Sequence, residues 1–160
     1  MTNSSQGTDK SKSLFDLSGR TAMITGGGGV LCRALSLALG RRGVKVAVLD
    51  LAKESAERVA AEIAAEGGEA TGLEGDVLSP DSLARARDAA VARFGRIDFL
   101  INGAGGNKPQ ASTSPERSFF DLPPDAVRWV FDLNFLGLLL SCQVFGKAMA
   151  ERGEGVILNI

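Results

Sequence analysis

The sequence predicts an α/β fold in which a doubly wound parallel sheet, with strands in the order 3-2-1-4-5, carries helices on both of its faces. From residue 20 onward, short apolar runs alternate with amphipathic stretches, which is the pattern of successive strand-helix-strand units. A run of glycines directly follows the first apolar run. The length of 160 residues suffices for one domain with a single core.

The expected elements follow in order along residues 17–160, after a polar tail over residues 1–16 that we expect to be disordered. We expect strands at residues 21–25, 44–49 with Asp50 at the end, 70–74, 97–101 and 155–160. The first helix is expected to bury an apolar stripe of Leu31, Ala34, Leu35, Ala38 and Leu39, with Gly43 at its end. The other helices are expected around the stripe 56–63, from the Ser79 cap and Pro80 to Phe94 before Gly95, and over 124–149. Residues 108–116 are expected to form a mobile surface loop.

Composition and charge argue against several classes of function. The net charge is −1 and the basic residues are dispersed, so we expect no nucleic-acid partner. The two cysteines, Cys32 and Cys142, lie in apolar stretches, which predicts buried, reduced thiols and a cytoplasmic location. Because histidine is absent and two cysteines cannot form a ligand cluster, we expect no metal site. Without a secretory signal pattern or a run of 18 apolar residues, no membrane association is expected either.

The glycines Gly26, Gly27, Gly28 and Gly29, followed by Val30 and Leu31, lie between the first strand and the first helix. Backbone N–H groups and the positive end of a helix dipole meet there, which is where the pyrophosphate of a dinucleotide can bind. Four consecutive glycines lose much backbone entropy on folding, so such a run indicates a positive φ or the close approach of a ligand. A flexible turn that binds nothing is the alternative.

Two acidic residues follow strands at positions suited to an adenosine. Asp50, followed by Leu51, lies 24 positions after Gly26, near the offset at which a carboxylate binds the ribose hydroxyls. A 2′-phosphate there would be repelled by roughly 4 kcal/mol at about 4 Å and an effective dielectric constant near 20, which predicts NAD rather than NADP unless Lys53 compensates. Asp76, followed by Val77, could bind the adenine amino group or form an Asx turn.

Two asparagines complete the candidate residues. Asn102 ends the fourth expected strand, and Ala104 and Gly105 after it are small enough for a cofactor to lie against the backbone. Asn134 lies in the apolar stretch of residues 131–140, and burying an unpaired amide costs about 1 to 3 kcal/mol. We therefore expect either a hydrogen bond to a neighbouring strand or a part in a proton path linked to water or cofactor.

Together these residues resemble the short-chain dehydrogenase/reductase family, whose pattern after the first strand is T-G-x-x-x-G-[IL]-G. Thr25, Gly26 and Leu31 match the pattern, whereas Val30 and Cys32 replace its second and third glycines. Asp76 corresponds to the family's adenine-contacting acid, Asn102 with Ala104 and Gly105 to its N-x-A-G motif, and Asn134 to the asparagine of its catalytic tetrad. The resemblance covers residues 17–160. The segments at 25–32, 102–107 and 131–137 are similar to the D-mannonate oxidoreductase (fructuronate reductase) group.

The resemblance implies a Rossmann-like domain and an NAD(H)-dependent oxidoreductase that exchanges hydride with a carbonyl or alcohol carbon of a small molecule such as a sugar acid. It also implies a serine and a Tyr-x-x-x-Lys pair beyond the fifth strand. We expect these 160 residues to be the N-terminal part of the domain, without that pair, and inactive alone. A homo-oligomer, dimer or tetramer, is expected through the helix at 124–149. A non-catalytic dinucleotide-binding or scaffold module is the alternative.

Overall fold

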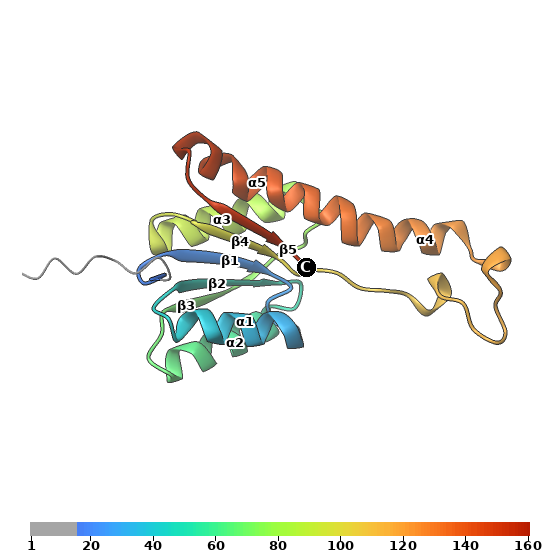
Figure 1. The fold of residues 1–160 in the computed structure, drawn as a ribbon, viewed down its shortest axis with the longest axis horizontal. Helices are drawn as coiled ribbons and strands as arrows, with labels where there is room; N and C mark the ends of the chain where they lie inside the picture. Colours follow the sequence, from blue (N-terminus) through green and yellow to red (C-terminus); the bar gives the residue numbers. More distant parts are fainter. Residues whose placement is uncertain (1–15) are drawn as a thin grey trace, which may run out of the picture.

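The computed structural model describes residues 16–160, so the predicted tail lies almost entirely outside the described residues. Five parallel strands form one sheet in the order β3-β2-β1-β4-β5, which confirms the predicted topology (Figure 1). The strands are β1 (Thr21–Thr25), β2 (Lys45–Asp50), β3 (Ala70–Glu74), β4 (Phe99–Asn102) and β5 (Val156–Asn159). The principal helices are α1 (Val30–Gly40), α2 (Lys53–Ala65), α3 (Pro80–Phe94), α4 (Pro124–Phe131) and α5 (Gly137–Arg152).

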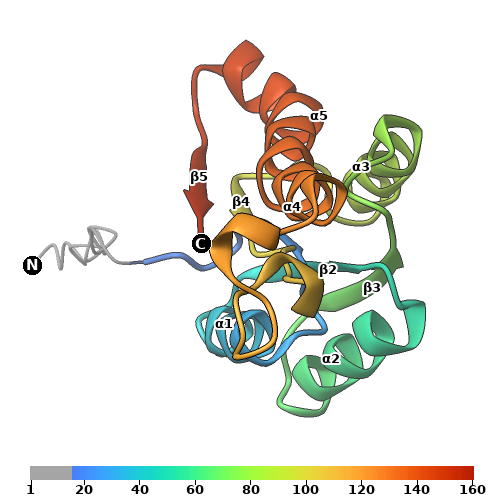
Figure 2. The same cartoon turned by 90° about the vertical axis from the view of Figure 1, so that its right-hand side faces the viewer.

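The helices cover the sheet in two layers, with α1 and α2 on one face and α3 and α5 on the other (Figure 2). The central strands are buried on both sides, so their residues alternate between two cores. Ala22, Ile24, Val46 and Val48 pack toward α1 and α2, whereas Met23, Ala47 and Leu49 pack toward α3 and α5. Strands buried on both faces explain the continuous apolar runs from which the parallel sheet was predicted.

Helix α3 shows why several boundaries were predictable. The Ser79 hydroxyl accepts a hydrogen bond from the Ser82 N–H at 3.3 Å, Pro80 occupies the first helical position, and Gly95 follows the last residue with φ of +87°. Each signal acts locally. Ser79 accepts a hydrogen bond from a free N–H at the helix start, Pro80 needs no N–H partner there, and Gly95 adopts the positive φ that ends the helix. The predicted range therefore coincides with the observed one.

The predicted buried stripe of α1 is wrong for Leu31, Ala34 and Ala38, which are exposed, whereas Leu35 and Leu39 are partly buried against the core. The buried residues are Cys32, Ser36, Leu37 and Gly40, whereas Leu31 is 56% exposed. Gly40 approaches α2 so closely that a Cβ there would stand 2.7 Å from the Cγ2 of Ile63. The buried side of the helix therefore carries mostly small residues, Cys32, Ser36 and Gly40, together with Leu37.

The predicted helix over residues 124–149 runs on to Arg152, and a π-helical segment, η3 (Asp132–Leu136), joins α4 to α5. The α4 end projects beyond the sheet, and the loop after β4, with the short 3-10 helices η1 (Pro109–Ala111) and η2 (Phe119–Asp121), runs alongside it (Figure 1). By length and a mean hydropathy of 1.4 this 29-residue run also meets the criteria for a membrane span. That indication is weak, because core helices of soluble proteins meet the same criteria.

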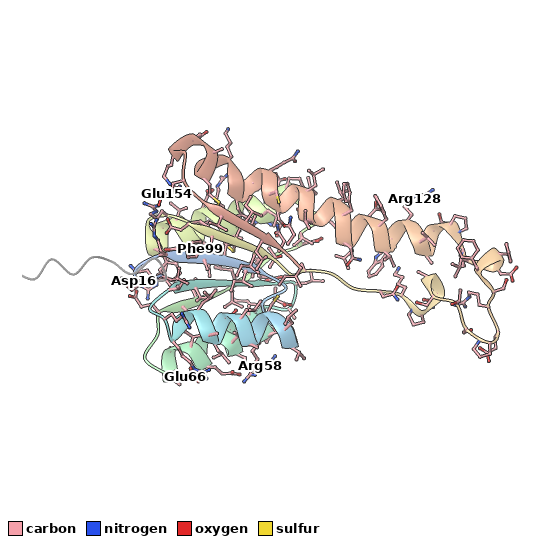
Figure 3. All side chains as sticks on the ribbon, in the orientation of Figure 1. Asp16, Arg58, Glu66, Phe99, Arg128 and Glu154 are labelled. Carbon is pink, nitrogen blue, oxygen red and sulfur yellow. The ribbon has the colours of Figure 1, made fainter. Side chains whose placement is uncertain are left out.

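A charge cluster closes the sheet at the amino ends of its strands. The buried Asp98 carboxylate accepts a hydrogen bond from the Thr21 N–H at 2.9 Å and pairs with Arg20 at 3.4 Å and with Arg96. Glu154 pairs with the same two arginines, and its hydrogen bonds, first from Arg20 and then from Arg96, hold its pKa below the ordinary value. In Figure 3, Glu154 lies at the end of the sheet opposite to the projecting helix that carries Arg128.

Candidate cofactor-binding site

A cavity of about 280 Å³ opens at the carboxyl ends of the strands. It is lined by Gly26, Gly29, Asp50, Leu51, Gly75, Asp76, Val77, Gly103, Ala104, Gly105 and Leu133. Eight of these were predicted as site residues. In open parallel sheets, ligands bind at the carboxyl ends of the strands, at the topological switch point, where successive strands are added on opposite sides of the first strand. That strand is β1, which lies between β2 and β4.

The other predicted residues do not line this cavity, although several are adjacent to residues that do: Gly27, Gly28, Val30, Leu31, Asn102 and Asn134. Gly75, Gly103 and Leu133 line the cavity without having been singled out. Each of these three is the immediate neighbour of a predicted residue. That adjacency is the only signal in the sequence that could have identified it.

The glycine loop turns sharply at Gly26, whose φ is +64°. A Cβ at this position would stand 2.7 Å from the carbonyl oxygen of Gly103, so β1 and β4 approach each other here too closely for a side chain. The Gly29 N–H donates to the Gly26 carbonyl at 3.0 Å and closes the turn. These contacts define the shape of the glycine loop where Gly26 and Gly29 line the cavity.

Helix α1 begins at the cavity with its first N–H groups free. Gly29 is the N-cap residue and supplies no capping side chain. The N–H groups of Val30, Leu31 and Cys32 have no hydrogen-bond partner among the described residues. Because the Val30 side chain is 92% exposed, it does not block access to them. Free N–H groups at the positive end of a helix dipole are suited to an anion.

At Gly27 and Gly28, neighbouring protein atoms, rather than a ligand, leave no room for a side chain. A Cβ on Gly27 would stand 2.5 Å from the Cγ1 of Val48, because its N–H is bonded to the Leu49 carbonyl at 2.9 Å. A Cβ on Gly28 would stand 2.9 Å from the Oδ2 of Asp50. A Cβ on Gly28 would also stand 2.6 Å from the Cβ of Ser55, so the close approach inferred from the glycine run is, at these two positions, an approach of β2 and α2.

Asp50 connects the glycine loop to the end of β2. Its Oδ2 accepts a hydrogen bond from the Gly28 N–H at 2.9 Å, and its Oδ1 accepts one from the Ala52 N–H at 3.0 Å. A carboxylate can accept about four hydrogen bonds, so acceptor positions remain for a ligand. Among the described residues no cation pairs with it, and Lys53 pairs instead with Glu57 at 3.7 Å.

Asp76 forms the Asx turn that was one of its two predicted roles, since its Oδ1 accepts a hydrogen bond from the Leu78 N–H at 2.8 Å. Its own N–H donates to the Ser82 hydroxyl at 3.1 Å. The side chain remains exposed at the edge of the cavity, next to the buried Val77.

Asn102 is buried and ties three elements together instead of facing the cavity. Its Nδ2 donates to the Oδ1 of Asn159 on β5 at 2.9 Å and contacts the Sγ of Cys142 on α5 at 3.3 Å. The Thr25 hydroxyl accepts hydrogen bonds from the N–H groups of Gly103 and Ala104, each at 3.2 Å. Thr25 therefore fixes the backbone that lines the cavity after β4.

The structure corrects the prediction that Asn134 is buried. Its side chain is exposed, and its partner is a loop rather than a strand. Nδ2 donates to the carbonyls of Gly106 and Val130, both at 2.7 Å, and Oδ1 accepts from the Gly106 N–H at 3.2 Å. Of its apolar neighbours in sequence, Phe135 and Leu136 are exposed and only Leu133 packs against the core, so the burial of Asn134 did not follow from them.

Cys32 is buried behind the glycine loop, and burial, assisted by the charge of Asp50, raises the pKa of its thiol. A Cβ on Gly103 would overlap its sulfur, so the cysteine fills the space between α1 and β4. Cys142 is only half-buried, and both cysteines are free thiols. Among residues 16–160 no cluster of three or more metal-ligating side chains occurs.

Comparison with known proteins identifies relatives over nearly the whole described chain. The short chain dehydrogenase family model matches residues 20–160. The uncharacterised oxidoreductase UxuB of Bacillus subtilis (strain 168) is 44% identical over 153 residues, which are 91% of this chain and 55% of that protein.

Two solved structures share the fold. One, from Haemophilus influenza with bound NAD and provisionally assigned as a D-mannonate oxidoreductase, superposes with a TM-score of 0.82 at 39% identity, over 90% of this chain and 55% of that one. An NAD+-bound xylitol dehydrogenase superposes with a TM-score of 0.79 at 31% identity, over 89% of this chain and 52% of that one. The chain thus spans about half the length of the relatives it matches, and it belongs to the short-chain dehydrogenase family of oxidoreductases.

Proposed function

We propose that these residues form the cofactor-binding part of an NAD(H)-dependent oxidoreductase that interconverts a carbonyl and an alcohol on a sugar acid of the fructuronate and D-mannonate type. The observation that carries the proposal is a cavity lined both by Gly29, which precedes the free N–H groups at the start of α1, and by Asp50, a carboxylate at the end of β2 that no described cation pairs with. The relationship to an NAD-bound structure provisionally assigned as a D-mannonate oxidoreductase supports the substrate class.

The residues present fit a dinucleotide. Gly26 to Gly29 and the first turn of α1, including Val30 and Leu31, would hold its pyrophosphate, and Asp50 with Leu51 would hold the adenosine ribose. Asp76 and Val77 would border the adenine, and Ala104 and Gly105, positioned through Asn102, would support the nicotinamide half. When bound, NAD supplies the hydride acceptor or donor.

Asn134 is the proposed catalytic residue of this segment. Both of its Nδ2 hydrogens are engaged by carbonyls of the protein. Its Oδ1 accepts one hydrogen bond and keeps a second acceptor position. We therefore assign it the role of holding a water molecule through Oδ1 in a proton path, while its amide fixes the loop after β4.

The preference for NAD rests on Asp50. A 2′-phosphate about 4 Å from this carboxylate would be opposed by roughly 4 kcal/mol at an effective dielectric constant near 20. Lys53 does not offset that repulsion, because it pairs with Glu57 on the same helix. Calorimetry on the full-length protein should show NADH bound at least about 10-fold more tightly than NADPH.

The Asp50→Asn variant should lose most of that preference, whereas the control Glu74→Gln should keep it. Glu74 lies opposite Asp50 in the β2–β3 register but does not line the cavity. Equal affinity of the unaltered protein for both cofactors would refute the cofactor assignment. For the substrate, NADH-dependent reduction of fructuronate by the full-length protein supports the proposal, and activity confined to steroids or acyl thioesters contradicts it.

We also propose that the protein is a homo-oligomer that associates through the helix at 124–149. The outer face of this helix exposes Val127, Phe131, Phe135 and Leu139, and the rings of Phe131 and Phe135 stack with centroids 5.1 Å apart. The same face holds an apolar hollow of about 360 Å³ beside Ala111. Light scattering should report a dimer or tetramer that Phe135→Glu dissociates. The free thiols favour the reducing cytoplasm as the location.

A further inference from the structure

The loop after β4 carries a lysine, Lys108, three residues after Gly105, which lines the cavity. We call residues 106–112 the strap; it leaves the carboxyl end of β4 and runs alongside the projecting helix (Figure 1). The strap is anchored where it begins, because Asn134 bonds both the N–H and the carbonyl of Gly106. Lys108 follows two residues after this anchor.

The backbone of Lys108 is held on both sides. Its N–H donates to the Oδ1 of Asn107 at 2.8 Å, and its carbonyl accepts from the Ala111 N–H at 2.9 Å. The Nδ2 of Asn107 in turn donates to the Ser112 hydroxyl at 2.8 Å. The position of the lysine along the strap is therefore defined by its neighbours.

The charged end of Lys108 has an aromatic neighbour and no anion. Its Nζ lies 4.1 Å from the centroid of the Trp129 ring, and no carboxylate among residues 16–160 forms an ion pair with it. The other basic groups nearby have polar partners, since Arg117 donates to the Pro109 carbonyl at 2.8 Å and Arg128 pairs with Asp125 at 2.8 Å. Trp129 lies one helical turn before Leu133, which lines the cavity.

We infer that Lys108 binds the carboxylate of the substrate and so selects acids over neutral polyols, an inference that rests on the proposed sugar-acid activity. A charge-assisted hydrogen bond to a carboxylate is stronger than a cation–π contact at a partly exposed site, so an arriving acid would draw the ammonium group from the ring. When no acid is bound, the Lys108 ammonium group stays in contact with the Trp129 ring.

The test compares Lys108→Met with Lys147→Met in the full-length protein. Lys147 is an exposed lysine on α5 that does not line the cavity. For D-mannonate oxidation, Lys108→Met should lower kcat/KM by about 10- to 100-fold, mainly through KM, as expected for a lost hydrogen bond to a charged group. The kcat/KM for D-mannitol, the neutral polyol with the same carbon chain, and the affinity for NADH should stay unchanged. Lys147→Met should leave all of these values unchanged.

The fluorescence of Trp129 gives a readout that is independent of turnover. Titrating D-mannonate into the complex with NADH should change the emission of the unaltered protein, because the cation leaves the ring. The Lys108→Met and Trp129→Phe variants should lack that change, and D-mannitol should not produce it. An emission change that persists in Lys108→Met would overturn the inference.

The kinetic outcomes separate this inference from the proposed function. If the unaltered protein oxidises D-mannonate and Lys108→Met does so equally well, only the assignment of Lys108 fails. Equal losses on the acid and on the polyol would also refute it, since they indicate a structural role. If the unaltered protein neither binds nor oxidises D-mannonate, the sugar-acid activity itself is wrong and the assignment falls with it.

Discussion

Replacing Gly26 by alanine should destabilise the protein and weaken cofactor binding, and Gly67 offers a matched control. Both glycines have positive φ, +64° at Gly26 and +85° at Gly67. Around Gly67 a Cβ would meet nothing within 4 Å, whereas at Gly26 it would stand 2.7 Å from the Gly103 carbonyl oxygen and 2.8 Å from the Ala104 N. Only Gly26→Ala therefore adds a clash with backbone to the strain of the left-handed conformation.

The magnitudes follow from these two contributions. A left-handed alanine costs roughly 1 to 2 kcal/mol, which is the whole effect expected for Gly67→Ala apart from a smaller gain in the unfolded state. Forcing the loop after β4 away from Gly26 adds about 1 to 3 kcal/mol, as for overpacking elsewhere in a core. We therefore expect Gly26→Ala to lower the free energy of unfolding by about 2 to 5 kcal/mol.

Urea unfolding of the full-length protein, followed by circular dichroism, measures this difference. Calorimetry measures the affinity for NADH. We expect it to fall at least about 10-fold in Gly26→Ala, because the displaced loop carries Gly103, Ala104 and Gly105, which line the cavity, and to stay unchanged in Gly67→Ala. Equal unfolding free energies for the two variants, with equal affinities for NADH, would show that the close approach of β1 and β4 at Gly26 does not shape the site.

Three further predictions concern the fold and the strap. Because the folded-state pKa of Glu154 is lowered, its contribution to stability is complete above the unfolded-state pKa and is lost as pH falls through the folded-state value. Melting from pH 7 to 3 should therefore show a shallower acid decline for Glu154→Gln than for the control Glu151→Gln. Phe145→Ala, at a side chain 1% exposed, should lower the free energy of unfolding by about 3 to 5 kcal/mol, whereas Phe120→Ala, at one 92% exposed, should change it by less than about 0.5 kcal/mol, both by urea titration. Asn134→Asp replaces a double donor by an acceptor facing two carbonyls, so amide hydrogen exchange in the strap should become faster; unchanged exchange would show that the strap does not depend on this amide.

Local signals made most of the fold predictable from the sequence. The cap at Ser79, the proline after it and the final Gly95 define α3, and the apolar runs of β1 and β2 indicate strands buried on both faces. The buried side of α1 was not predictable, because it depends on how closely Gly40 approaches Ile63 of another helix. A periodicity of large apolar residues does not report a contact that a glycine makes with another helix.

Site residues were predictable where the residue type and its place after a strand indicate the role. They were less predictable where the role depends on contacts between segments far apart in the sequence. Asp50 and Gly26 line the cavity as expected. Asn134 was misjudged, because the exposure of its side chain depends on where the projecting helix lies, and its partner Gly106 is 28 residues away. The packing of Cys32 against Gly103 likewise joins α1 to the loop after β4, which no spacing along the chain indicates.

The charge cluster of Asp98 and Glu154 stands at one end of the sheet and the cavity at the other, with the length of the strands between them. The acid-sensitive ion pairs of Glu154 therefore lie far from the residues that line the cavity. Substitutions in the charge cluster can therefore change acid tolerance without altering the residues that line the cavity. Mutational libraries directed at each end of the sheet could then be searched separately and their best members combined.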